Sequence, residues 1–176
     1  MLVKLEELLS RSKQDLSKAL ELLERGDVRD AAEKAWSSIE NMRKALLVAV
    51  KIPYDLAKNI STGVPLFIRI LRALNRKDLL EKYFFFNSHI HIYGFYEMIT
   101  PEEELETVIK DEVPRWISQM EDVIRSIKDI DLSNIVDILL KAQKLKSEIL
   151  RKSKEYADLQ AQLNMMIRTI ISQRDQ

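Results

Sequence analysis

The two histidines of the chain are its first candidates for chemistry, because they stand two residues apart in its most aromatic stretch. His89 and His91 lie in KDLLEKYFFFNSHIHIYGFYEM, residues 77–98. Histidine titrates near neutral pH, so the pair could act as general acid and base, or it could ligate a metal ion together with Glu97. No further strong ligand follows at helical spacing, and structural histidines suit the aromatic surroundings equally well. We therefore expect no metal site, while a catalytic role for either histidine stays open.

Two groups of basic residues could bind phosphate. Arg69, Arg72 and Arg76 follow helical spacing on one face of a predicted helix, which makes either a phosphate-binding stripe or a solvated face with ion pairs. We favour the solvated face, which is common in charged helices. The second group could hold a nucleic-acid backbone or flank a coiled coil. It consists of Lys141, Lys144, Lys146, Arg151, Lys152 and Lys154.

Composition excludes several classes of function. Lysine and arginine number 28 and aspartate and glutamate number 28, so no overall charge attracts nucleic acid. The absence of cysteine excludes disulfides, thiolate nucleophiles and cysteine-ligated metals, and it fits a reducing compartment. We find no basic segment followed by an apolar one at the N-terminus, and no apolar run of about 18 residues. The sequence predicts a soluble, cytoplasmic protein without a cofactor.

Helical periodicity predicts an all-α fold organised around residues 28–51. Apolar residues recur there with a period of 3.6, and Gly26 separates this helix from a first amphipathic helix over residues 2–25. A connection this short makes the two helices antiparallel neighbours. We expect Trp36, and Trp116 later in the chain, to be largely buried on the apolar faces of their helices.

The middle of the chain carries the signals that separate its other helices. Residues 52–64 read as a loop that can contain one short helical turn, and Pro65 belongs to the first turn of a third helix. The aromatic stretch reads as a helix that bends toward Gly94. Thr100, Pro101 and Glu103 predict a capped helix start. The helix that follows should run from about residue 101 to 128 with a kink near residues 110–114, because Pro114 interrupts its hydrogen bonding.

The last part of the chain predicts one long helix, residues 134–172, about 55–60 Å in length at 1.5 Å per residue. Its heptad seam consists of Ala142, Leu145, Ile149, Lys152, Tyr156, Leu159, Leu163, Met166 and Ile170. We therefore divide the chain into a bundle of residues 1–130 and a C-terminal helix of residues 131–176. An apolar seam of this length must pack against another surface in a soluble protein. We expect a homo-oligomer, a dimer in the first place, whose interface includes residues 142–170.

Three stretches resemble the archaeal PaREP-type proteins of the HEPN superfamily, over about residues 5–128. They are ERGDVRDAAEKAWSSIENMRKALL (residues 24–47), HIHIYGFYE (residues 89–97) and the helix start TPEEELE (residues 100–106). The resemblance implies a HEPN-like antiparallel helical bundle and frequent homodimerisation. In parts of the superfamily it also implies RNA cleavage, or pairing with a nucleotidyltransferase, in toxin–antitoxin and defence systems.

HEPN ribonucleases resemble one another in an arginine that precedes a histidine with about four to six residues between them. No arginine stands at that interval before His89 or His91, and Lys82 before His89 is the nearest substitute. A lysine cannot reproduce the bidentate contact of a guanidinium with phosphate. We therefore predict a non-enzymatic interaction module that binds RNA, a nucleotide or a protein partner. The alternative is a divergent HEPN-type ribonuclease that uses His89 or His91, with Lys82 as a further candidate.

Overall fold

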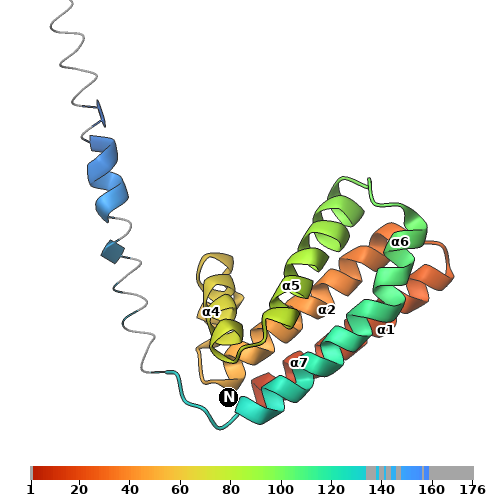
Figure 1. Ribbon diagram of the computed structural model, residues 1–176, viewed down its shortest axis with the longest axis horizontal. Helices are drawn as coiled ribbons and strands as arrows, with labels where there is room; N and C mark the ends of the chain where they lie inside the picture. The colour runs from red at the N-terminus through yellow and green to blue at the C-terminus, as the bar shows by residue number, and fades with distance from the viewer. Residues whose placement is uncertain are drawn as a thin grey trace, which may run out of the picture. The chain divides into compact units, whose positions relative to one another are not determined.

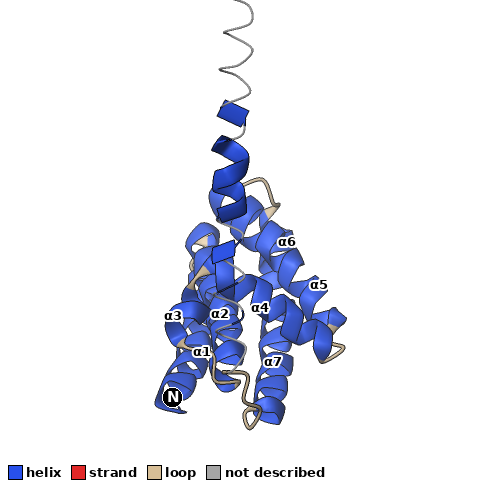
Figure 2. Cartoon of the chain, turned by 90° about the vertical axis from the view of Figure 1, so that its left-hand side faces the viewer, coloured by secondary structure: helices blue, strands red, loops and turns tan. Residues whose placement is uncertain are grey.

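The computed structural model describes residues 2–133 without interruption, and beyond them residues 138, 141, 144–145, 148–155 and 157–158. Contacts within the chain divide it into two units, residues 1–133 and 134–176, and each is described by itself. Every regular element of the described residues is a helix, as Figure 2 shows, which confirms the all-α class. None of the described helices is long and apolar enough to cross a membrane.

The first unit is built on a helical hairpin, α1 (Leu2–Glu24) and α2 (Val28–Ala49). Gly26 joins the two helices in the left-handed conformation, with φ at +75°. Ser12 and Ser38 then bind the pair together, because each hydroxyl donates to the backbone carbonyl of the other residue at 2.9 and 2.7 Å. Helix α2 also contacts the later helices of the unit and lies between them in Figure 1, which confirms it as the central helix.

The predicted loop over residues 52–64 is wrong for most of its length, because helices occupy it, although one short helical turn was expected there. A short helix α3 (Tyr54–Lys58) is followed at once by α4 (Ile60–Ala73). The side chain of Asn59 accepts a hydrogen bond from the backbone N–H of Ser61 at 2.9 Å, which starts α4 before the predicted position. Pro65 therefore lies inside the helix and not in its first turn.

The aromatic stretch bends by changing its helix type. Helix α5 (Lys77–Phe86) continues into a π-helix, η1 (Asn87–Tyr96). Only glycine fits at position 94, because a Cβ atom there would lie 2.8 Å from the carbonyl oxygen of His89 and 3.1 Å from Leu105. The predicted distortion toward Gly94 is thus a π-helix that packs closely on the next element.

Helix α6 (Glu102–Thr107) runs without a break through a π-helical segment, η2 (Val108–Glu112), into α7 (Val113–Ile127). This confirms one continuous helix that is distorted just before Pro114. The predicted capping box is wrong. The residue at the N-cap position of α6 is Pro101, and no side chain caps the helix. The hydroxyl of Thr100 instead donates to the carbonyl oxygen of His89 at 3.0 Å.

The two tryptophans differ. Trp116 is 2% exposed, and its indole N–H donates to the carbonyl oxygen of Leu79 at 2.9 Å, as expected for the core. Trp36 is less completely enclosed, since it is of intermediate exposure and does not belong to the fully buried core. One side of its ring system is covered by the rings of Tyr83 and His91, and the residue borders a pocket.

In the second unit the described residues are helical. Leu145, Ile149 and Lys152 of the predicted seam are exposed there. The other seam positions, namely residues 142, 156, 159, 163, 166 and 170, lie outside the described residues. The long helix and its seam therefore stay a prediction.

Candidate functional site

A buried ion pair on the central helix anchors the candidate site. Arg43 is fully buried, and its Nε and Nη2 atoms each donate to a carboxylate oxygen of Glu40 at 2.8 Å. Its Nη1 atom donates to the carbonyl oxygen of Ala57 at 2.9 Å. A bidentate pair of this kind is strong and directional, and here all three nitrogens of the guanidinium have an acceptor. Arg43 thus fixes the position of the Glu40 carboxylate.

Tyr83 completes this network from α5. Its hydroxyl donates to the Oε1 atom of Glu40 at 2.9 Å. Burial by itself would raise the pKa of Glu40, but the hydrogen bonds and positive charge of Arg43 outweigh it and hold the pKa below its usual value. Burial and the Glu40 charge raise the pKa of Tyr83 well above its ordinary range. Glu40 is therefore an anion and Tyr83 a neutral phenol at any ordinary pH.

His91 lies beside this network and packs among aromatic rings. Its imidazole stacks on Trp36 with centroids 4.8 Å apart and an interplanar angle of 17°, and it meets the ring of Tyr96 edge-on at 4.9 Å. Its Nδ1 atom is enclosed and has no hydrogen-bond partner among the described residues. Burial lowers the pKa of His91, and the charge of Glu40 opposes this only in part.

The neutral state of His91 determines what it offers a ligand. A proton on the enclosed Nδ1 atom would be a donor without an acceptor, which is costly. The favoured tautomer therefore carries its proton on Nε2. Nε2 is also the ring nitrogen that is not enclosed. His91 can donate one hydrogen bond from this atom to a group in front of it.

The change from α-helix to π-helix places Tyr83, Asn87 and His91 along one side. In an α-helix, residues four apart drift by about 40° around the axis, because a turn takes 3.6 residues. The wider turn of η1 opposes that drift from residue 87 onward. As a result all three side chains border the same pocket, about 270 Å³ in volume. Its full lining is Trp36, Glu40, Ile60, Val64, Tyr83, Phe84, Asn87 and His91, which we call the aromatic pocket.

The other histidine is in different surroundings. His89 stacks on Phe85 with centroids 4.1 Å apart, and its Nδ1 atom lies 3.2 Å from the carbonyl oxygen of Phe85. Its Nε2 atom lies 3.9 Å from a carboxylate oxygen of Glu104 on α6. His89 does not border the aromatic pocket, so the structure does not bring the two histidines together.

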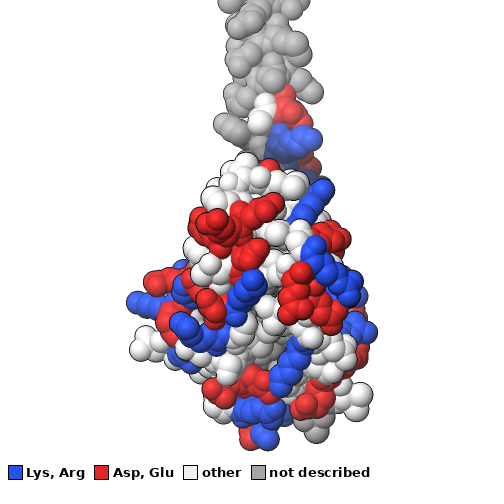
Figure 3. Space-filling model, turned by 90° about the vertical axis from the view of Figure 1, so that its right-hand side faces the viewer, with Lys and Arg blue, Asp and Glu red and all other residues white. Residues whose placement is uncertain are grey.

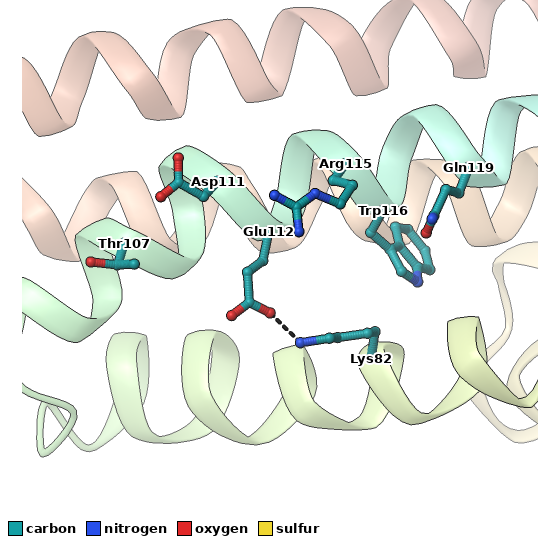
Figure 4. Close-up of a pocket in the computed structure, with 7 residues that line it drawn as sticks. All are labelled: Lys82, Thr107, Asp111, Glu112, Arg115, Trp116 and Gln119. Atoms are coloured by element: carbon teal, nitrogen blue, oxygen red, sulfur yellow. Dashed lines mark hydrogen bonds and ion pairs between the residues drawn. The ribbon is translucent and has the colours of Figure 1, made fainter.

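Lys82 borders a second pocket, about 320 Å³ in volume, which lies between α5 and the η2–α7 segment. Figure 4 shows its side chain reaching from α5 to the carboxylate of Glu112, with which it forms an ion pair. The ammonium group also lies 5.0 Å from the centre of the Phe85 ring. We call this second pocket the polar groove. Its lining is Lys82, Thr107, Asp111, Glu112, Arg115, Trp116 and Gln119.

The three arginines proposed for phosphate lie apart from both histidines. Arg69 and Arg72 are exposed on α4, and neither forms an ion pair with a described residue. Arg76, just before α5, is bound to the carboxylate of Asp78 at 2.7 Å. None of the three borders the aromatic pocket or the polar groove. Among the described residues there is no group of three histidine or carboxylate side chains that could hold a metal ion.

Sequence reasoning missed Glu40, Arg43 and Asn87. A signal for the first two was present, because Arg43 follows Met42 and precedes Leu46 on a helix whose apolar face is wide. A charged pair three residues apart on such a face indicates a buried ion pair as well as a surface one. Asn87 carried no signal, because its place on the pocket depends on the π-helix.

The fold and the site define an all-helical bundle with a buried ion pair beneath an aromatic pocket. The model of one protein family matches residues 7–114, which is more than half of the chain and includes every residue that lines the aromatic pocket. The chain belongs to this family, the archaeal PaREP1/PaREP8 family, as its sequence motifs predicted. No curated protein and no solved structure matches the chain.

Proposed function

We propose that this protein is a non-enzymatic, HEPN-like binding module that holds an uncharged planar ring, the base of an RNA or a nucleotide, in its aromatic pocket. The observation that carries the proposal is that aromatic side chains line the pocket while its one charged group, the Glu40 carboxylate, already has its hydrogen-bond partners. Trp36, Tyr83, Phe84 and His91 provide aromatic surface, while both oxygens of Glu40 already accept hydrogen bonds. A ring that stacks is the ligand that such a pocket favours.

The size and the free polar groups of the pocket support the same ligand class. A volume of 270 Å³ is just below the range of about 300–1,000 Å³ that is usual for pockets of drug-sized ligands. It suits a single ring system. Asn87 can donate and accept a hydrogen bond through its amide, and His91 can donate one from Nε2. These two groups suit the edge of a heterocyclic base.

The charges around the pocket disfavour phosphate inside it. No lysine or arginine borders it, and the guanidinium of Arg43 is fully used by Glu40 and Ala57. The alternative, a divergent HEPN-type ribonuclease, needs a cation close to a histidine at the scissile phosphate. Lys82 is held by Glu112 in the polar groove instead. The phosphate of a bound nucleotide would therefore stay in solvent.

We also propose that the protein is a homodimer in which the C-terminal helix, residues 142–170, contributes to the interface. The described part of that segment supports this proposal. Leu145, Ile149 and Leu150 are all at least 59% exposed, and apolar side chains that cluster on a surface commonly mark an interface. A nucleotidyltransferase remains the protein partner that the HEPN resemblance suggests.

Fluorescence titration tests the proposed ligand. Trp36 is half-buried at the pocket, so stacking of a base should quench the tryptophan emission of the full chain when a short single-stranded RNA is added. The variants are compared by the fluorescence anisotropy of a labelled RNA, because Trp36→Ala also removes the reporter. Trp36→Ala should abolish binding and His91→Ala should weaken it. His89→Ala is the matched control and should bind like the wild type. Equal affinity for the Trp36→Ala variant would refute the proposal. Cleavage of the RNA by the wild type but not by His91→Ala would establish the ribonuclease instead.

A further inference from the structure

A group of exposed apolar side chains lies at the end of η1, at the opposite end of the bundle from the N-terminus. Residues 93–104, here called the tip, form the loop at the top of the bundle in Figure 1 and the start of α6. Four of their large apolar side chains are exposed: Tyr93 at 39%, Tyr96 at 64%, Met98 at 61% and Ile99 at 64%. Four such side chains within seven residues are a local concentration of exposed apolar surface, which commonly marks an interaction site.

The tip is a built structure. The carbonyl oxygen of Tyr93 accepts hydrogen bonds from the backbone N–H groups of Ile99 and Thr100 at 2.8 and 3.3 Å. Met98 between them adopts φ of 53°, a left-handed conformation that a non-glycine residue rarely takes. Such strain persists only where the surroundings impose it, and it recurs at binding sites.

The charge of the tip and its surroundings has one sign. No lysine or arginine occurs from Tyr83 to Ile109, whereas the glutamates there are Glu97, Glu102, Glu103, Glu104 and Glu106. Glu97, Glu102 and Glu103 form no ion pair with any described residue, whereas Glu106 is paired with Lys110 at 2.8 Å. The tip itself meets a cation at Phe95, where the guanidinium of Arg29 lies 5.3 Å from the ring centre. Figure 3 shows acidic side chains beside uncharged surface on the upper part of the bundle.

An acidic apolar surface selects a basic apolar partner. Phosphate-bearing partners, which include RNA and anionic membranes, are repelled by unpaired carboxylates. The chain itself contains a segment of the opposite charge and the same apolar character. In residues 141–154, Leu145, Ile149 and Leu150 are exposed. The basic side chains described around them are Lys141, Lys144, Arg151, Lys152 and Lys154, all of them exposed.

We infer that the tip binds the basic apolar segment 141–154 of a second copy of this chain. The inference rests on the homodimer proposed above, and it specifies what the C-terminal helix packs against. In a two-fold dimer each copy gives one tip and one segment, so the contact is made twice. Carboxylates of the tip then meet ammonium and guanidinium groups of the segment around a shared apolar centre.

Two charge reversals in the full chain test the inference. One variant carries Glu97→Lys, Glu102→Lys and Glu103→Lys, and the other carries Arg151→Glu, Lys152→Glu and Lys154→Glu. Each variant alone sets like charges against each other in its own dimer, so its dissociation constant in sedimentation equilibrium should rise by at least about tenfold. An equimolar mixture of the two should form a heterodimer about as tight as the wild-type dimer, because both contacts then join opposite charges.

A matched variant controls for net charge alone. Glu6→Lys, Glu81→Lys and Asp122→Lys make the same change at exposed carboxylates away from the tip, and this variant should dimerise like the wild type. A wild-type dimer that is insensitive to the tip reversal overturns the tip as the contact while leaving the proposed dimer intact. A mixture that fails to pair overturns it as well. A wild-type chain that is monomeric at micromolar concentration overturns both proposals.

Discussion

The aromatic pocket and the polar groove both border α5 and have similar volumes, but their polar groups are placed in opposite ways. At the aromatic pocket the lining carboxylate of Glu40 is only 15% exposed, and the fully buried Arg43 beneath it uses all its guanidinium nitrogens in hydrogen bonds. In the polar groove Lys82 and Glu112 form their ion pair at the surface, where solvent competes with it. Buried charges hold neighbouring groups in place, whereas exposed pairs contribute little to stability. The comparison therefore identifies the aromatic pocket as the preorganised site.

Among the substitutions that test this difference, removal of Arg43 should have the largest effect on stability. Arg43→Met leaves the Glu40 carboxylate buried without its partner, so the free energy of unfolding should fall by about 3–5 kcal/mol. Urea denaturation followed by circular dichroism measures this loss. Replacement of both residues, Glu40→Leu with Arg43→Met, should recover much of it. An Arg43→Met variant as stable as the wild type would show that the Glu40–Arg43 ion pair is not shielded from solvent.

Gly63 tests how closely α4 packs on the same ion pair. A Cβ atom there would lie 2.3 Å from the carbonyl oxygen of Ala57 and 2.5 Å from Nη1 of Arg43. Gly63→Ala should therefore lower the free energy of unfolding by about 1–3 kcal/mol, because backbone must move to make room. Thermal denaturation would reveal it. A Gly63→Ala variant that is more stable than the wild type would contradict the close approach.

The pKa of His91 predicts a pH dependence. Because burial lowers this pKa in the folded chain, the folded state favours the neutral ring. The contribution of His91 to stability is fully present above the pKa of about 6.5 that a histidine has in the unfolded chain. It is lost as the pH falls toward the lower pKa of His91 in the folded chain. His91→Gln should remove this part of the decline between pH 7.5 and pH 5 in chemical denaturation, and His89→Gln serves as its control. A wild-type decline that His91→Gln leaves unchanged would place the cause elsewhere.

Loss of the surface ion pair should have the smallest effect. Lys82→Ala should change the free energy of unfolding by less than about 1 kcal/mol, since exposed pairs are screened by water and salt. It should also leave base binding unchanged, because Lys82 does not border the aromatic pocket. Denaturation and RNA titration of the same preparation check both statements. A large loss of RNA affinity would make the polar groove the functional site.

Local signals were enough for much of the fold and little of the site. Gly26 and the apolar period predicted the hairpin, and Pro114 predicted a distorted but continuous helix. The loop prediction failed over residues 59–64 because Asn59 caps a helix there, and the first turns of that helix contain residues that usually form turns. The expected cap at Thr100 was wrong because α6 begins one residue later, with Pro101 at the N-cap position, while the Thr100 side chain is bound to the carbonyl oxygen of His89. These outcomes depend on contacts between distant segments, which no local pattern records.

The site depends even more on tertiary contacts. Glu40 and Arg43 look in the sequence like an ordinary pair on a helix surface, and only packing against α3 and α5 buries them. His89 and His91 look like one site, but alternate residues on a helix point in different directions. The π-helix then sets His91 against Trp36, which is 55 residues earlier in the chain.

The central claim is that the aromatic pocket binds a ring and not a phosphate, and calorimetric titration of the full chain tests it most directly. Adenosine, adenosine monophosphate and ribose 5-phosphate separate the two contributions. We predict that adenosine and its monophosphate bind with similar affinity, that Trp36→Ala abolishes both, and that ribose 5-phosphate does not bind. Binding that requires the phosphate and survives Trp36→Ala would contradict the account.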